Sequence, residues 1–265
     1  MKFSKYSSAG NDFLLFECGE DQEIKGAAHL TPSQWERVCQ RGQGVGADGV
    51  LFLSRNPYKM EYINSDGHPA EMCGNGLRAI CSYIATYDQV KNWPIDVVTQ
   101  NFTYKADYKD NQVWIEMADI KDAGKIDCGD MFKEALNSYF INTGVPHTVF
   151  EVENVDNIDI NAIAAPIRAD KRFENGANVN FYEVLSPGKL KMRVFERGVE
   201  GETLSSGTGT TAVGLAYRHL HQFDGDLEIH PPGGKMQMHF KNGNAWLTGP
   251  VVEVYRGELS ESFLA

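Results

Sequence analysis

The chain has 265 residues, of which 42% are hydrophobic, and its net charge is −11. An apolar fraction of this size predicts a globular protein with a substantial core, folded as one large domain or as two of about 130 residues each. The acidic balance argues against nucleic acid or an anionic membrane as a partner, because both attract clustered Lys and Arg. No apolar run approaches the ~20 residues that span a bilayer, and the N-terminus lacks an apolar signal segment, so a cytoplasmic protein is expected.

Alternating or β-branched segments predict strands through the first half, with Gly, Asn and Asp in the turns. A helix is predicted from Pro32 to about Gln40, with Thr31 as its N-cap. A second helix is predicted from Leu77 to about Tyr87, and apolar residues around most of its circumference indicate that it is enclosed. The predicted strands are Lys2–Tyr6, Phe13–Glu17, Val50–Leu53, Lys59–Asn64, Ile95–Thr99, Phe102–Tyr108 and Gln112–Met117.

The second half of the chain shows the same kinds of strand and helix pattern. A weaker helical pattern covers Asn157–Ile163, and a helix that is apolar on most sides is predicted at Thr210–His221. The seam is expected near Asp119–Gly124, which divides the chain into domains 1–119 and 120–252, with the last strand, about 253–265, returning to the first domain. Each half therefore reads as strands plus one buried helix, an α+β class. The predicted strands are Tyr139–Thr143, Thr148–Val152, Val179–Val184, Leu190–Val194, Asp226–His230, Met236–Phe240, Ala245–Thr248 and Val251–Tyr255.

The cysteines are odd in number and include no Cys-x-x-Cys pair. A disulfide framework and a structural zinc site are therefore not expected, and the thiols are predicted to be reduced. We interpret all of them except Cys73 as core-filling residues. The five are Cys18, Cys39, Cys73, Cys81 and Cys128.

A glycine-rich segment, Gly44–Gly49, satisfies the pattern G-x-G-x-x-G. A dinucleotide-binding fingerprint must follow a strand and open a helix. Here the predicted order is reversed, because a helix precedes the segment and a strand follows it. We therefore interpret these glycines as a tight connection that brings backbone close to the site, and we do not expect a nucleotide.

A loop that leads into a helix occurs twice. The segment Met72–Gly76 reads MCGNG, and Ser205–Gly209 reads SSGTG, so that Cys73 in the first copy matches Ser206 in the second. Free N–H groups at the start of a helix, together with its dipole, form a cradle for a carboxylate, and glycine lets a ligand approach closely. The same field stabilises a thiolate, so Cys73 is expected to be more acidic than a free cysteine, at ~8.5, and able to act as a base or a nucleophile.

Two such cradles acting on one substrate suggest a chain that builds one site from two related halves. A base on each side of the carbon next to the bound carboxylate could remove a proton from one face and return one to the other. That reaction inverts a stereocentre with neither a metal nor an organic cofactor, and the sequence contains no metal-ligand cluster or pyridoxal-binding context for either.

At this point the pattern resembles the diaminopimelate epimerase family over essentially the full length. The resemblance implies two pseudo-symmetric domains, each a mostly antiparallel sheet wrapped around a central helix, with the active site in the cleft between them. It implies interconversion of LL- and meso-diaminopimelate by two opposed cysteines without a cofactor, in cytoplasmic lysine and peptidoglycan precursor supply, and it leaves a homodimeric assembly open. The segments that carry it are Ser8–Phe13, Gly44–Asp48, Asn64–Gly67, Met72–Gly76, Thr143–His147, Asn178–Phe181 and Glu196–Gly209.

The resemblance also assigns roles to single residues. Cys73 resembles one acid/base thiol, and Ser206 stands where the family has the other. Arg197 can pair with a carboxylate through two hydrogen bonds, and Glu196 can accept from an ammonium group. The carboxylate cradle would be the backbone of Gly74, Asn75, Gly207 and Thr208; Asn11 would lie near the reacting amino acid head; and Asn64, Asn178, Glu196 and Arg197 would hold chiefly the distant head.

Three positions depart from the family pattern: Val145 replaces an Asn, Gly49 replaces a Gln found in some members, and Ser206 replaces the second thiol. A serine hydroxyl is a poor base unless another group activates it, and His147 could approach Ser206 only through the fold. The leading hypothesis is a diaminopimelate epimerase slowed by ~10²–10⁴, with an engineered serine. The alternatives are a natural variant acting as a dehydratase or as a racemase of another amino acid, and a non-catalytic amino acid binder.

Overall fold

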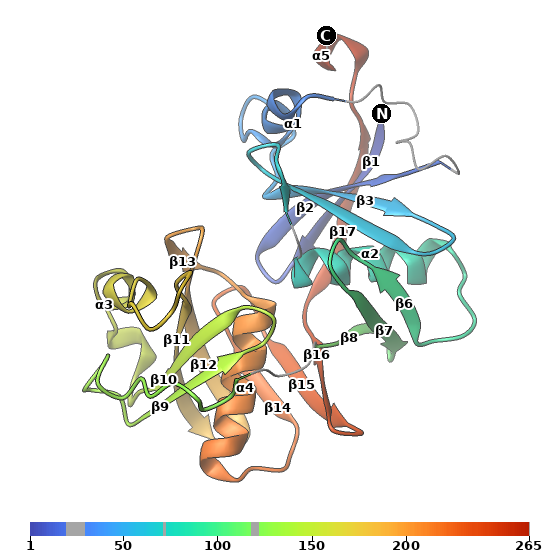
Figure 1. Ribbon diagram of the computed structural model, residues 1–265. Helices are drawn as coiled ribbons and strands as arrows, with labels where there is room; N and C mark the ends of the chain where they lie inside the picture. The colour runs from blue at the N-terminus through green and yellow to red at the C-terminus, as the bar shows by residue number, and fades with distance from the viewer. Residues whose placement is uncertain (20–29, 71–72, 118–121, 265) are drawn as a thin grey trace. The chain divides into compact units, whose positions relative to one another are not determined.

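The computed structural model describes residues 1–19, 30–70, 73–117 and 122–264. The chain forms two compact units (Figure 1): unit 1 comprises Met1–Ile115 with Pro250–Ala265, and unit 2 comprises Glu116–Gly249. The seam predicted at Asp119–Gly124 falls partly on residues 118–121, which lie outside the described residues.

Unit 1 is a sheet with its strands in the order β17-β1-β2-β3-β4-β6-β7-β8, and β5 is also paired with β4. The pairs β2–β3 and β4–β6 are parallel and the others are antiparallel. The elements are β1 Lys2–Ser8, β2 Asn11–Glu17, α1 Pro32–Cys39, β3 Gly49–Ser54, β4 Lys59–Asn64, β5 Pro69–Ala70, α2 Gly74–Tyr87, β6 Ile95–Val98, β7 Thr103–Lys109, β8 Gln112–Glu116, β17 Val251–Glu258 and α5 Glu261–Leu264.

Unit 2 repeats this plan with the strand order β9-β10-β11-β12-β14-β15-β16, and β13 is also paired with β12. The pairs β10–β11 and β12–β14 are parallel, at the same places as in unit 1. The duplication inferred from two short loops therefore extends through the whole unit. The elements are β9 Asn137–Asn142, β10 Pro146–Glu151, η1 Val155–Asn157, α3 Ile160–Arg168, β11 Asn178–Ser186, β12 Lys189–Glu196, β13 Gly201–Thr203, α4 Gly207–His221, β14 Leu227–His230, β15 Met236–Lys241 and β16 Asn244–Thr248.

Each sheet is covered by helices on both faces. In unit 1, α1 packs Trp35 against Phe16 and Phe52, with ring centroids 5.5 and 5.3 Å apart. Side chains alternate along a strand, so Leu51, the neighbour of Phe52 in β3, faces α2 on the opposite side. Burial on both faces explains why β2 and β3 carry continuous apolar runs, as strands with parallel partners commonly do.

The central helices α2 and α4 are enclosed, as their apolar circumference predicted. Buried residues run from Asn75 to Ile84 in α2 and from Gly209 to Tyr217 in α4, with few interruptions. The α+β class with a mostly antiparallel sheet around a central helix in each repeat is therefore confirmed.

Element boundaries differ from the prediction in a consistent way. Helices α2 and α4 both begin three residues earlier than predicted, because Cys73 and Ser206 are themselves the N-caps and the glycine-rich segments form the first helical turn. Helix α3 lies at Ile160–Arg168, and the weak prediction at Asn157–Ile163 overlaps only its start. Every predicted strand is present, but the last one, predicted to run to about residue 265, ends at Glu258 and is followed by α5. The short elements β5, β13, η1 and α5 were not predicted.

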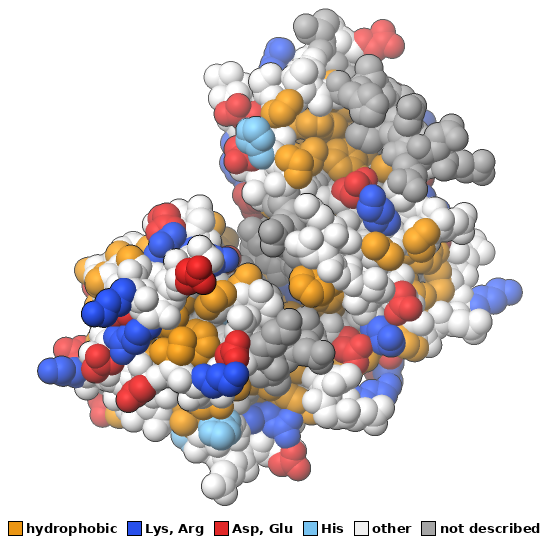
Figure 2. Space-filling model, in the orientation of Figure 1, with side chains coloured by type: hydrophobic (Ala, Val, Ile, Leu, Met, Phe, Trp, Pro, Cys, Tyr) orange, Lys and Arg blue, Asp and Glu red, His pale blue; other side chains and the backbone are white. Residues whose placement is uncertain are grey.

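The visible surface intersperses acidic and basic side chains (Figure 2), with no area given over to one sign. In the part of the chain that the structure describes, no helix is long and apolar enough to cross a membrane.

Candidate active site

The half-site of unit 1 is built at the N-terminus of α2. Cys73 is the N-cap, with extended backbone (φ −138°, ψ 112°), and its carbonyl accepts the first helical hydrogen bond from Leu77 N–H at 2.8 Å. Its side chain caps no N–H of the helix and is partly exposed. The N–H groups of Gly74, Asn75 and Gly76 belong to the first turn and have no helical acceptor, as the cradle requires.

A chain of hydrogen bonds runs beneath this turn. The guanidinium of Arg78 donates to Asn75 Oδ1, Asn75 Nδ2 donates to Asn11 Oδ1, and Asn11 Nδ2 donates to Asp48 Oδ2 at 3.3 Å. Arginine offers only donors and a carboxylate only acceptors, so the two ends fix the orientation of both amides. Asn11 and Asn75, two predicted substrate contacts, are thus held together.

Arg78 is the most deeply placed charge of this half-site. Its side chain is 1% exposed, and its Nε finds no hydrogen-bond partner among the described residues. Burial lowers the pKa of Arg78 to about 10, and the charge of Cys73 opposes that shift. A buried cation near the Cys73 sulfur therefore favours its thiolate form.

Two cations neutralise the acidic end of this series of hydrogen bonds. Lys5 lies 2.6 Å from Asp12, and Arg41 lies 2.5 Å from Asp12 and 2.8 Å from Asp48. Burial alone would raise the pKa of Asp12, but hydrogen bonds from Arg41 and Lys5 lower it to about 2. This cluster anchors Asn11 at the β1–β2 hairpin, which lies in the same unit.

Asn64, the fourth predicted contact of unit 1, ends β4. Its side chain is exposed, and its backbone closes a turn through Gly67 N–H to Asn64 O at 2.9 Å. Directly opposite it in the sheet is Gly49, where an added Cβ would lie 2.4 Å from the ring of Tyr62. The aromatic ring therefore fills the space that a side chain at position 49 would need.

The half-site of unit 2 is built in the same way at α4. Ser206 is the N-cap (φ −126°, ψ 122°), and its Oγ accepts a hydrogen bond from Gly209 N–H at 3.2 Å. The Thr208 hydroxyl lies 3.4 Å from the same oxygen. Thr143, at the start of the β9–β10 connection, donates to Thr208 O at 3.3 Å and ties the first turn to the sheet.

The predicted gripping residues of unit 2 form one cluster. Asn178 Oδ1 accepts from the backbone N–H of Arg197 at 2.9 Å, and Asn178 Nδ2 donates to Pro146 O at 3.3 Å. Glu196 accepts from the Thr203 hydroxyl at 2.5 Å. Burial raises the pKa of Glu196, although the hydrogen bond from Thr203 opposes the rise.

His147 and Asn180 lie fully buried beneath α4. Asn180 Nδ2 donates to Thr148 O at 2.9 Å and lies 3.1 Å from His147 Nδ1. A carbonyl can only accept, so Nδ2 is the donor to both partners, and the proton of a neutral His147 is on Nε2. Burial lowers the pKa of His147 to about 3, which keeps it neutral, and the charge of Arg197 acts in the same direction.

The structure thus groups the predicted residues within their own units, while their roles stay predictions. It adds two that sequence reasoning missed. Arg78 had a readable signal, a lone charge on an otherwise apolar helical face. Asn180 had a weaker one, a polar residue two positions after Asn178 on the same face of a strand.

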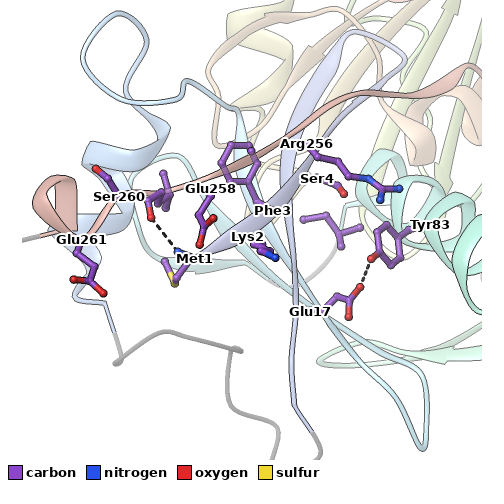
Figure 3. Close-up of a pocket in the computed structure, with 13 residues that line it drawn as sticks. Met1, Lys2, Phe3, Ser4, Glu17, Tyr83, Arg256, Glu258, Ser260 and Glu261 are labelled. Atoms are coloured by element: carbon purple, nitrogen blue, oxygen red, sulfur yellow. Dashed lines mark hydrogen bonds between the residues drawn. The ribbon is translucent and has the colours of Figure 1, made fainter.

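The four other cysteines are buried, and burial raises the pKa of Cys39 to about 11, although the charge of Lys5 opposes the rise. A pocket in unit 1 lies along β1, β2 and β17 (Figure 3), where Tyr83 donates to Glu17, and none of the predicted site residues lines it. Among the described residues, no group of three or more His, Cys, Asp or Glu side chains could hold a metal ion.

Comparison with known proteins bears on the family and the fold. The diaminopimelate epimerase family model matches residues 3–121 and 139–260. The diaminopimelate epimerase of Methanocella arvoryzae is 34% identical, covering 100% of this chain and 99% of that protein, and that of Methanothrix thermoacetophila is 35% identical, covering 100% and 98%. A phenazine biosynthesis protein of the PhzF family from Enterococcus faecalis shares the fold, with a TM-score of 0.72 at 12% identity and 98% of each chain covered. The chain belongs to the diaminopimelate epimerase family.

Proposed function

We propose that the protein is a cofactor-independent isomerase that moves a proton at the α-carbon of diaminopimelate, between the LL and meso forms. Membership of the family supports the substrate. The observation that carries the chemistry is that Cys73 and Ser206 occupy the same N-cap position in two copies of one structural unit.

In this proposal the two N-cap side chains act on opposite faces of one α-carbon. The Cys73 thiolate removes the α-proton, and the electron pair stays on the carbon and its carboxylate. That carboxylate is held by the first-turn N–H groups of Gly74, Asn75, Gly207 and Thr208, which stabilise the developing negative charge. Ser206 then delivers its hydroxyl proton to the other face, and the resulting oxyanion accepts from Gly209 N–H until solvent restores the proton.

The distant head of the substrate would be held by Asn64, Asn178, Glu196 and Arg197. Arg197 suits a carboxylate, and Glu196 suits an ammonium group, because charge-assisted hydrogen bonds are the strong ones. The buried position of Asn178 and its bond to the Arg197 backbone support this assignment, since they hold the Arg197 backbone in place. Asn11 would contact the reacting head.

A hydroxyl is a far weaker acid than a thiol, so inversion should be slow. We expect Ser206→Cys to raise the rate of inversion by ~10²–10⁴, the usual contribution of a general acid or base. The assay follows deuterium incorporation and stereochemistry of LL- and meso-diaminopimelate in D₂O. Cys73→Ala should abolish incorporation. An unchanged inversion rate in Ser206→Cys would refute the proposal.

The same assay distinguishes the alternative functions. Binding without any α-hydrogen exchange would identify a non-catalytic binder, and a keto or enamine product from a hydroxylated amino acid would identify a dehydratase. We further propose that the protein acts in the cytoplasm, in lysine and peptidoglycan precursor supply, and a homodimer is the assembly to test by light scattering.

A further inference from the structure

Tyr62 lies in β4, which together with β3 packs against α2. Its partner across the strands is Leu51, whose Cδ2 would lie 2.8 Å from an added Cβ at Gly76 in the first turn of α2. Residues directly opposite each other on antiparallel strands point to the same face of the sheet, so Tyr62 faces α2 as Leu51 does. Asn64, two residues further along β4, points to that face as well. Tyr62 therefore belongs to the half-site that contains Cys73 and Asn64.

The ring of Tyr62 is held over Gly49. An added Cβ at Gly49 would lie 2.4 Å from Tyr62 Cε2 and 2.9 Å from the hydroxyl oxygen of Tyr62. The buried ring of Phe13 packs edge-on against that of Tyr62, with centroids 6.0 Å apart and planes at 77°. Gly49 pairs with Asn64, so the glycine allows the Tyr62 hydroxyl to reach the end of β4 where Asn64 lies.

The Tyr62 hydroxyl is a donor without an acceptor. It makes no hydrogen bond within the described part of the chain, and Tyr62 is only partly buried, so the hydroxyl is open to a ligand. Burial raises the pKa of Tyr62, and the charges of Cys73 and Asp48 act in the same direction, so the phenol keeps its proton at neutral pH. Enclosed tyrosine rings usually find a hydrogen-bond partner for their hydroxyl. The half-site thus presents one O–H group to whatever binds there.

The matched positions of unit 2 carry polar and apolar side chains the other way round. Gly49 and Asn178 begin β3 and β11, which pair in the same way with the strands before them. Two residues on, the cross-strand partners are Tyr62 in unit 1 and Val194 in unit 2. Unit 2 therefore has the amide of Asn178, proposed to hold the distant head, above an apolar Val194. Unit 1 has no side chain at Gly49, and the Tyr62 hydroxyl occupies the space beside it.

We propose that Tyr62 determines specificity at the end of the substrate away from the reacting carbon, where its hydroxyl donates a hydrogen bond to the distant carboxylate of diaminopimelate beside Asn64. This role rests on the proposed function. A carboxylate has only acceptors, whereas an ammonium group has only donors and would leave the hydroxyl hydrogen unused. Hydrogen bonds to a charged acceptor are also the stronger kind. The site should therefore favour amino acids whose side chain ends in a carboxylate.

The test compares ligands that lack one half of the distant head. Lysine is diaminopimelate without the distant carboxylate, and 2-aminopimelate is diaminopimelate without the distant amino group. Dissociation constants are measured by calorimetry, which needs no turnover. Tyr62→Phe keeps the ring over Gly49 and should weaken binding of diaminopimelate and of 2-aminopimelate roughly tenfold, the scale of one hydrogen bond to a charged group. Binding of lysine should change less than about twofold, because lysine lacks the group that the hydroxyl contacts.

Two further variants control for a structural effect. Tyr62→Val, which copies the matched Val194, removes the ring as well and should show the same dependence on the distant carboxylate. Tyr104→Phe removes a hydroxyl from β7, two strands further along the sheet, and should alter none of the affinities. In the exchange assay in D₂O, Tyr62→Phe should raise KM for diaminopimelate roughly tenfold at unchanged kcat, because the contact is made equally in the ground state and the transition state.

Equal binding of diaminopimelate by Tyr62→Phe and the unaltered protein would overturn this role for Tyr62 and leave the proposed function standing. A loss as large for lysine as for diaminopimelate would also overturn it, because the hydroxyl would then act on something other than the distant carboxylate. Absence of α-hydrogen exchange in the unaltered protein would instead overturn the proposed function. The three affinities would still show in that case whether Tyr62 contacts the carboxylate.

Discussion

The substitution Ser206→Cys should lower the stability of the folded protein, and Cys73→Ser should raise it. Ser206 and Cys73 have nearly the same backbone conformation, with φ of −126° and −138° and ψ of 122° and 112°. Only Ser206 caps its helix with its side chain, through Gly209 N–H at 3.2 Å. Sulfur is a weak acceptor, so Ser206→Cys loses this bond, whereas a serine at position 73 can form the equivalent bond with Gly76 N–H.

The magnitude follows from the geometry of the cap. A Ser N-cap contributes about 0.5–2 kcal/mol, and a bond of 3.2 Å lies at the long end of the normal range, so about 1 kcal/mol is expected. For a chain of this size that corresponds to a change of roughly 2–4 °C in melting temperature, downward for Ser206→Cys and upward for Cys73→Ser. The gain of inversion in Ser206→Cys would then accompany a loss of stability.

The assay is thermal and urea unfolding of both single variants and the double variant. The two changes lie in separate units, so their effects should add and nearly cancel in the double variant. A Ser206→Cys variant as stable as the unaltered protein, or a Cys73→Ser variant that is less stable, would refute the reasoning from the caps.

Three other outcomes follow from the buried groups. The folded pKa of His147, about 3, lies below its unfolded value, so the free energy of unfolding should fall as the pH drops from about 6.5 toward 3, by up to about 1.4 kcal/mol per pH unit. The variant His147→Asn keeps a hydrogen-bond acceptor but cannot titrate. Urea unfolding of this variant at several pH values should therefore lack that part of the pH dependence. Arg78→Met removes a buried cation that interacts with Cys73 and should slow alkylation of that thiol by iodoacetamide several-fold at neutral pH, with equal rates counting against the interaction. Gly76→Ala should cost about 1–3 kcal/mol, and Leu51→Ala should cost less in that variant than alone, because the new methyl group fills part of the cavity.

The duplication was readable in the sequence because glycine spacing and an enclosing apolar helix occur twice. The strands were readable for a similar reason, since alternation and β-branched runs act locally. The start of α2 was not, because glycine has a low helix propensity and places the predicted start at Leu77. In the structure the helix begins at Gly74, because Cys73 adopts the N-cap conformation and the backbone of Gly76 packs closely against Leu51.

The residues of the candidate site also differ in whether local sequence alone could predict them. Cys73, Ser206 and their cradles follow from residue type next to a helix start, which is local information. Arg78 and Asn180 owe their significance to burial and to polar atoms left without partners, which arise only when distant strands meet. Both residues can be read from the sequence, but the three-dimensional contacts that distinguish them from ordinary polar residues cannot.

The two units also show which features the fold itself requires. Glycine is present at the third helical position of both α2 and α4, and in both an added Cβ would strike the strand beneath, at 2.8 Å in one unit and 2.6 Å in the other. The N-cap and the residue struck differ together: Cys73 accompanies Leu51, and Ser206 accompanies Asn180. The Ser206 oxygen accepts from Gly209 N–H, whereas the Asn180 oxygen accepts from no described residue. The glycine is therefore what the two copies share, because the helical turn passes close to the strand in both, and the side chains above and below it are free to differ.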